Sequence, residues 1–199
     1  MPRLAIQDEQ LSIYDFLNLE MNAPAWERWE LVRGQVVRAM AGASLAHGEI
    51  VQNIARALDN HLRTARPGCR VYTQDARVND FADETSVLPD IVVRCGPRKR
   101  DEQSITDPLV LIEVLSKSTE DYDRGPKWAA YQAIESLQFH AVVDQYRLLV
   151  ETNTRTDAGW QKDAVQGRSR QMEIPSLDFA MTLDEIYQGV VELERFGRS

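Results

Sequence analysis

Two apolar segments of this 199-residue chain each carry a carboxylate where packing would favour an apolar side chain. Asp90 follows Pro89 and precedes Ile-Val-Val, and Glu113 lies within the apolar run from Leu109 to Leu115. Burial of an unpaired carboxylate is unfavourable by several kcal/mol, or raises its pKa until the group is neutral. A sequence that keeps such groups is expected to place a binding partner beside them. Asp90 and Glu113 are therefore the first candidates for chemistry.

The order of the two segments predicts that the carboxylates converge. Asp90 stands near the start of one expected strand, 87–94, and Glu113 near the end of the next, 108–115. If these strands pair antiparallel, the start of one lies beside the end of the other. Two converging carboxylates repel each other unless a cation lies between them, and hard oxygen ligands with room for water suit Mg²⁺ or Mn²⁺. The sequence therefore predicts a Mg²⁺ or Mn²⁺ site at this sheet edge.

A lysine further along the chain strengthens this prediction. In the helix expected over 123–135, Lys127 shares the core-facing stripe with Tyr131, and an inward lysine normally has an anionic partner. Taken singly, each residue has an ordinary explanation. Asp90 suits a turn, Glu113 suits a strand end that reaches solvent, and Lys127 suits a side chain that extends past the core. The three together favour one shared active site.

The segments that must position these residues alternate between helices and strands. Apolar periodicity and end signals predict helices over 12–20, 44–64 and 123–135 and one after Thr182, a hairpin over 29–40, and strands over 69–79, 87–94, 108–115, 138–144, 147–154 and 160–165. Because strand pairs joined by short turns dominate, this is not a regular βαβ repeat. We expect an α/β fold of mixed α+β character, with a mixed central β-sheet flanked by helices.

The same residues resemble a known nuclease group. Pro89-Asp90, followed by Glu113 after an apolar strand, is the signature of the PD-(D/E)XK superfamily, which has the restriction-endonuclease-like fold. A more specific likeness, to the bacterial Uma-type family of restriction endonucleases, is carried by residues 29–37, the His47 helix, residues 88–93, and residues 112–119 with Asp123 and Lys127-x-x-x-Tyr131 after them. The resemblance covers about residues 10–190, and the combined run is more specific than the bare signature.

This resemblance implies a mixed sheet core with flanking helices and divalent-metal-dependent hydrolysis of phosphodiester bonds. Carried over to this chain, Asp90 and Glu113 are the metal ligands, and the backbone carbonyl of Val114 adds a further oxygen. Glu30 matches the N-terminal acidic position of the pattern, where it reaches the same metal or the attacking water. The implied cofactor is Mg²⁺ or Mn²⁺.

One position departs from the superfamily pattern. The residue two after Glu113 should be lysine but is Leu115. In this branch the lysine has moved to the next helix, so Lys127 is the matching candidate and Lys117 the second choice. Lys127 would offset charge that develops on the phosphorus or orient the nucleophile. Catalysis therefore depends on Lys127 reaching the pocket.

Other polar residues near the expected pocket are weaker candidates. His47 heads the apolar stripe of its helix, and the family pattern also has a histidine there. It is either a satisfied core histidine or a pocket-edge group that hydrogen-bonds water, phosphate or Glu30. Gln74 and Asp75, in the strand before Asp90, are further candidates for the same pocket.

The charge balance bears on the partner. The densest basic cluster consists of Arg94, Arg98, Lys99 and Arg100, in and beside the loop 95–107, which is either a phosphate-contact surface or a solvated loop. The chain has 31 acidic and 23 basic residues, and its net charge of −8 repels nucleic acid at long range. A specific substrate, a homodimer that joins two basic faces, or a partner subunit would reconcile this charge with action on DNA.

Length and composition limit the class of protein. A chain of 199 residues suits one domain, which we place at residues 1–199 with a core over about 10–190. Hydrophobic residues at 43% and charged residues at 27% exclude a disordered chain. With neither a bilayer-spanning apolar run nor a signal core, a cytoplasmic protein without membrane contact is expected. Cys69 and Cys95 lack metal-binding spacing and are expected to be reduced, small buried side chains.

These observations favour a metal-dependent endonuclease that acts on DNA. The main alternative is a catalytically inactive nuclease-fold module that binds nucleic acid or a protein. A second alternative is another phosphoryl-transfer hydrolase, with nucleotides or RNA as substrate. Divalent-metal binding that disappears in Asp90→Ala would separate the first two, and a panel of substrates would identify the third.

Overall fold

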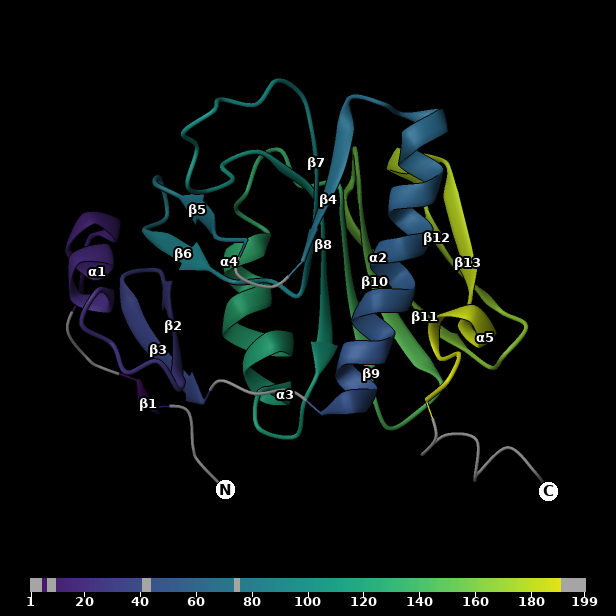
Figure 1. Cartoon of the computed structure of the whole chain (residues 1–199), viewed down its shortest axis with the longest axis horizontal. Helices are drawn as coiled ribbons and strands as arrows, with labels where there is room; N and C mark the ends of the chain where they lie inside the picture. Colours follow the sequence, from purple (N-terminus) through teal and green to yellow (C-terminus); the bar gives the residue numbers. More distant parts are fainter. Residues whose placement is uncertain (1–4, 7–9, 41–43, 74–75, 191–199) are drawn as a thin grey trace.

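The main layer of the molecule is a six-stranded mixed sheet in the order β11-β10-β9-β8-β7-β4 (Figure 1). The computed structural model describes residues 5–6, 10–40, 44–73 and 76–190. The strands are β4 (Cys69–Thr73), β7 (Ile91–Cys95), β8 (Pro108–Leu115), β9 (Phe139–Asp144), β10 (Leu149–Thr156) and β11 (Gly159–Gln166). All neighbours pair antiparallel except β8 and β9, which are parallel. The expected mixed central sheet flanked by helices is confirmed.

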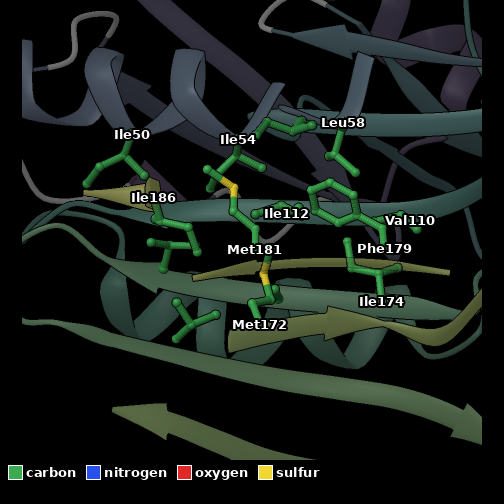
Figure 2. Packing of buried hydrophobic residues seen from close by; sticks show 14 of the residues in the cluster. Ile50, Ile54, Leu58, Val110, Ile112, Met172, Ile174, Phe179, Met181 and Ile186 are labelled. Atoms are coloured by element: carbon green, nitrogen blue, oxygen red, sulfur yellow. The ribbon is translucent and has the colours of Figure 1, made fainter. Parts of the chain in front are cut away.

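Strand β8 is buried on both faces because helices cover the sheet on either side. Val110 and Ile112 pack in one cluster with α2 (Leu45–Ala65), as Figure 2 shows for Ile112, Ile54 and Leu58. Leu111 belongs instead to the cluster of the opposite face. Side chains of a strand alternate between faces, so Glu113 shares the face of Leu111. Glu113 is thereby directed away from α2 and toward the second helical layer.

That second layer is one helical run with a widened turn in its middle. It consists of α3 (Glu120–Tyr122), the π-helical turn η1 (Asp123–Lys127) and α4 (Trp128–Tyr131). It begins and ends earlier than the predicted span of 123–135. Pro126 lies inside η1, and because proline has no backbone N–H it cannot complete the ordinary helical ladder. Asp123 and Lys127 are both buried, so the widened turn directs two charged side chains inward.

A second sheet of five strands, ordered β1-β3-β2-β6-β5, lies beside the first. Its strands are β1 (Ala5–Ile6), β2 (Glu27–Val32), β3 (Gln35–Met40), β5 (Val78–Asp80) and β6 (Thr85–Val87), and α1 (Ile13–Glu20) packs against β2. The expected hairpin is confirmed, with its turn at Arg33-Gly34. Both turn residues have positive φ, which matches the twist of the flanking strands.

The strand expected over 69–79 is divided in the structure. β4 pairs with β7 in the main sheet, whereas β5 pairs with β6 in the second. Gln74 and Asp75, the weaker pocket candidates, lie outside the described residues.

The C-terminal part completes the large core cluster. It contains β12 (Gln171–Ile174), the 3-10 turn η2 (Pro175–Leu177), β13 (Phe179–Thr182) and α5 (Leu183–Ile186). Met172 and Met181 from β12 and β13 pack on the same cluster as α2 (Figure 2). The capping box of Thr182 and Glu185 that opens α5 is confirmed. Of the helices in the described ranges, none combines the length and apolar character needed to cross a bilayer. The boundaries of a single domain at residues 1–199 stay a prediction.

The expectation of two reduced cysteines is wrong. Cys69 and Cys95 form a disulfide between the neighbouring strands β4 and β7. They lie in different segments, 26 positions apart, and only the antiparallel register places them opposite each other. Spacing along the chain gave no sign of this pairing, because it depends on which strands become neighbours.

Candidate active site

A buried lysine lies at the centre of a cluster of carboxylates. Lys127, only 4% exposed, places its Nζ 2.9 Å from Glu113 Oε1, 3.0 Å from Glu30 Oε1 and 3.8 Å from Asp123 Oδ1. These three acidic residues come from β8, β2 and η1, so the site joins both sheets and the second helical layer. The structure thus brings Glu30, Glu113 and Lys127 together. Lys127 has the anionic partners that an inward lysine needs.

Asp90 reaches the same region through the antiparallel pairing of β7 with β8. It directly precedes β7, and Ile91 is registered with Ile112. Asp90 Oδ2 accepts a hydrogen bond from the backbone N–H of Val114 at 2.8 Å. His47 Nε2, from the first turn of α2, lies 3.2 Å from the same oxygen. The expected convergence of Asp90 with the carboxyl end of β8 is therefore present, and His47 is a partner of Asp90 rather than of Glu30.

Two tyrosine hydroxyls and one backbone N–H fix the orientation of the glutamates. Tyr131 donates to Glu113 Oε1 at 2.6 Å, and Tyr122 donates to Glu30 Oε2 at 2.6 Å. The backbone N–H of Leu88 donates to Glu30 Oε1 at 2.7 Å. The Lys-x-x-x-Tyr spacing signalled Tyr131, but no pattern in the sequence pointed to Tyr122 or Leu88. Their roles depend on how the second sheet packs beside the helical run.

The burial of so many charges shifts the pKa values of the acidic groups. Desolvation raises the pKa of Glu113 to about 8, although the charge of Lys127 opposes the shift. Burial likewise raises the pKa of Asp123 to about 6, although the charge of Lys127 again lowers it. Clusters of this kind, in which burial and specific charges both perturb a carboxylate, occur most often at functional sites.

Lys127 and Asp90 are held in their charged forms. Burial alone would lower the pKa of Lys127, but the charges of Glu113, Glu30 and Asp123 raise it. Burial alone would raise the pKa of Asp90, but hydrogen bonding and charge from His47, with the N–H of Val114, lower it. The site therefore holds a fixed cation beside a fixed anion.

The carboxylate oxygens that accept no hydrogen bond indicate which residues could bind a metal ion. Asp90 Oδ1 and Glu113 Oε2 accept no hydrogen bond from the residues that the structure describes, whereas both oxygens of Glu30 are occupied by protein donors. Two carboxylates with one open oxygen each fit a hard divalent cation that completes its shell with water. Within the described ranges, no group of three or more His, Cys, Asp or Glu side chains is placed to hold a metal. A metal bound here would therefore depend on the pair Asp90 and Glu113.

Comparison with known proteins gives the family. The Uma2 family model, described as "Putative restriction endonuclease", matches residues 13–184. This chain belongs to the Uma2 family. It is 32% identical over 166 residues to the uncharacterized protein slr1290 of Synechocystis sp., across 82% of this chain and 85% of that protein. It is 26% identical over 159 residues to the uncharacterized protein sll1609 of the same organism, across 78% and 88% of the two chains.

A solved structure shares the fold of this Uma2 family member. It is a crystal structure from Anabaena variabilis, described as "a putative nuclease belonging to DUF820". The TM-score is 0.69 at 15% identity, and the match covers 90% of this chain and 99% of that one. At this identity the likeness concerns the fold alone. Together with the family, it supports the restriction-endonuclease-like fold expected from the sequence.

The structure does not bring the basic cluster of the Uma2 chain to the carboxylates. Arg98, Lys99 and Arg100 lie in the loop between β7 and β8, at the top of the view in Figure 1, whereas the carboxyl end of β8 is at the bottom. The reason is the antiparallel pairing of these strands: the connecting loop must leave the edge opposite to Asp90. Phosphate contact by the three residues stays a prediction, at a distance from the pocket.

Beside the carboxylates, on the same face of the sheet, lies a cavity of about 500 Å³. Its lining includes Trp128, which follows Lys127, and Val142, which is registered with Glu113 in the β8–β9 pair. The fully buried His140 also lines it and stacks on Trp128 with ring centroids 4.7 Å apart. Burial lowers the pKa of His140 to about 3, and the nearby charge of Lys127 acts in the same direction. His140 is therefore neutral at physiological pH.

Proposed function

We propose that this Uma2 family member is a divalent-metal-dependent endonuclease that hydrolyses phosphodiester bonds of DNA. The observation that carries the proposal is the buried contact of Lys127 with Glu113 at 2.9 Å, beside Asp90 at the same sheet edge. Metal-assisted phosphoryl chemistry needs carboxylates for the cation and a positive group for the charge that develops on the phosphate. The family and the fold are consistent with this combination.

Asp90 and Glu113 are the residues that would hold Mg²⁺ or Mn²⁺, through the oxygens that have no protein donor. When bound, the ion supplies Lewis-acid polarisation of the phosphoryl oxygen and lowers the pKa of a water molecule. His47 and the Val114 N–H orient Asp90, and Tyr131 orients Glu113. Because each ligand uses its other oxygen for these bonds, the carboxylates are oriented before any metal binds.

Lys127 is the group that would face the developing negative charge. Its Nζ has a fixed position because Glu30 and Glu113 both contact it. Both carboxylate oxygens of Glu30 already accept hydrogen bonds from protein donors, so we assign Glu30 a positioning role rather than metal ligation. It ties Lys127 to the Leu88 backbone that leads into Asp90. The proposed site thus uses Glu30 to set the distance between the lysine and the Asp90 carboxylate.

The experiment that tests the proposal is cleavage of supercoiled and linear DNA with Mg²⁺ or Mn²⁺, and with chelator. Wild type is compared with Asp90→Ala and with Asp157→Ala, which removes an exposed carboxylate in the turn between β10 and β11. Metal-dependent cutting is expected in wild type and Asp157→Ala, with a loss of orders of magnitude in Asp90→Ala. Equal cutting by wild type and Asp90→Ala would identify a contaminant and contradict the proposal.

A second candidate function has two observations in its favour. Within the described ranges, no group of three metal-ligating side chains is present, and Lys127 already neutralises part of the carboxylate charge. These features suit a nuclease-fold module that binds nucleic acid or a protein without catalysis. Calorimetric titration with Mn²⁺ separates the two: a catalytic site binds the ion in wild type but not in Asp90→Ala.

We also propose a homodimer as the working form of the Uma2 chain on DNA. The net charge of −8 disfavours binding of DNA to a single chain, and a dimer would bring two basic loops to one substrate. Sedimentation with and without DNA measures the state directly. A protein that stays monomeric while it cuts DNA would contradict the dimer and leave the proposed chemistry intact.

A further inference from the structure

Two loops leave the main sheet at the edge that carries the candidate site. β8 and β9 are parallel, and Leu115 is registered with Asp144 at their carboxyl ends. The segments after both strands, 116–119 and 145–148, therefore start as neighbours, three residues beyond the row that contains Glu113. In open sheets, ligands bind in the crevice outside the carboxyl ends of parallel strands. These two loops form the rim of the proposed active site.

The rim is held in place by buried hydrogen bonds. The Gln145 side chain donates from Nε2 to the carbonyl of Leu115 at 2.5 Å and accepts from Ser44 Oγ at 2.6 Å. It thereby joins the end of β8, the loop after β9 and the N-terminal cap of α2. Asp144 Oδ1 accepts from the backbone N–H groups of Tyr146 and Arg147, at 2.8 and 3.1 Å. The backbone that carries Tyr146 is thus ordered without any ligand.

This ordered backbone presents an aromatic ring to solvent. Tyr146 is 43% exposed, although the residue before it is buried. Lys117 Nζ, from the neighbouring loop, lies 5.0 Å from the centroid of the Tyr146 ring. Leu45 is 88% exposed and follows Ser44, the residue that contacts Gln145. An aromatic face and a cation therefore lie together on an ordered rim.

We propose that Tyr146 and Lys117 form a platform for an unpaired nucleobase and its phosphate, next to the bond that is cut. This inference rests on the proposed function and specifies its substrate class. Aromatic rings beside cations bind single-stranded nucleic acid, because every base has a face that can stack and every nucleotide has a phosphate. A base inside a duplex already stacks on both sides and cannot offer that face. The preferred substrate therefore has a single-stranded or unpaired nucleotide beside the scissile phosphate.

The test measures binding separately from cleavage. Fluorescence anisotropy is recorded with labelled single-stranded DNA, single-stranded RNA and blunt duplex DNA, in chelator so that nothing is cut. Tyr146→Ala is expected to weaken binding of single strands by roughly 5- to 150-fold and to leave duplex binding within about twofold. Tyr146→Phe, which keeps the ring, should bind like wild type. Tyr14→Ala is the matched control, because Tyr14 is 70% exposed and lies on α1, which packs against the second sheet.

Lys117 gives a second, independent measurement. If its ammonium contacts a phosphate, Lys117→Ala should lower the slope of log affinity against log salt by about 0.7 for single strands. An unchanged slope would remove Lys117 from the platform. Equal affinity of wild type and Tyr146→Ala for single strands, or no measurable binding of single strands by wild type, would overturn the inference.

The outcome for the platform can be told apart from the outcome for the nuclease. Binding of single strands that depends on Tyr146, together with no cleavage in any metal, would support the platform and reject the proposed function. Metal-dependent cleavage of duplex DNA that is unaffected by Tyr146→Ala, with no preference for single strands, would reject the platform alone. Comparison of the affinities for single-stranded DNA and single-stranded RNA identifies which nucleic acid supplies the unpaired base.

Discussion

Lys127 Nζ lies 2.9 Å from Glu113 Oε1, and both side chains are almost fully buried. The contact joins the helical run after β8 to β8 itself, so one ion pair connects the two elements that build the site. Breaking a buried pair leaves an uncompensated charge, which is far more unfavourable than loss of an exposed pair. The same contact therefore has consequences both for stability and for the proposed catalysis.

Replacement of the lysine should be strongly destabilising. Lys127→Met keeps much of the side-chain volume but leaves Glu113 and Glu30 without their cation. We expect the free energy of unfolding to fall by about 3–5 kcal/mol, measured by urea denaturation. Adding Glu30→Gln to Lys127→Met should recover part of the loss, because it removes a carboxylate that Lys127 no longer neutralises. A double variant that is no more stable than Lys127→Met would contradict this account.

Divalent metal should stabilise the folded chain through Asp90. An ion that binds only the native state raises the free energy of unfolding by about 2.7 kcal/mol at a concentration 100 times its dissociation constant. Thermal unfolding with Mn²⁺ and with chelator measures the effect. The gain should vanish in Asp90→Ala and persist in Asp157→Ala, which lacks only an exposed carboxylate in the turn between β10 and β11. The prediction is wrong if Mn²⁺ stabilises Asp90→Ala against thermal unfolding as much as it stabilises wild type.

Local patterns were enough to predict much of the fold and the identity of the inward charges. The span 108–115 coincides with β8, and the carboxylate within that apolar run is buried beside Lys127. Periodicity along a helix placed Lys127 on the inner face, because burial of a helix stripe depends on nearby residues alone. Two separate short-range signals thus pointed to one pocket.

Contacts between residues of different layers could not be predicted from local sequence patterns. Tyr122 binds Glu30, and Cys69 pairs with Cys95, only because the tertiary packing makes their elements neighbours. The sequence suggests phosphate contact by the basic loop that contains Arg98, but it does not show which edge of the sheet this loop leaves. The π-helical turn at Asp123 also had no sequence signal beyond Pro126, since helix patterns assume a regular period.

Acid should destabilise the chain through His140. Its pKa is lowered to about 3 in the folded state, mainly by burial, whereas an unfolded histidine titrates near pH 6.5. Between these values the unfolded state binds one more proton, so stability falls as pH falls from about 6.5 toward 3. From pH 7.5 to pH 5 this amounts to about 2 kcal/mol.

Urea denaturation of wild type and His140→Gln at the two pH values isolates this contribution. The variant cannot take up the proton, so its loss of stability on acidification should be smaller than that of wild type by about the same 2 kcal/mol. His61→Gln serves as the control, since His61 is only partly buried and hydrogen-bonds the carbonyl of Leu177. Identical pH dependence of wild type and His140→Gln would contradict a buried neutral imidazole.

Reduction of the Cys69–Cys95 disulfide should lower stability and leave the site unchanged. A cross-link over 26 positions restricts the unfolded chain, and its loss is expected to reduce the free energy of unfolding by about 3–4 kcal/mol. Cys95 ends β7, whereas Asp90 precedes the start of that strand. Cys69→Ser/Cys95→Ser should therefore lose stability as reduced wild type does, yet keep the Mn²⁺-dependent stabilisation. Two free thiols titrated in unreduced native protein would rule out the pairing and, with it, this dependence on reductant.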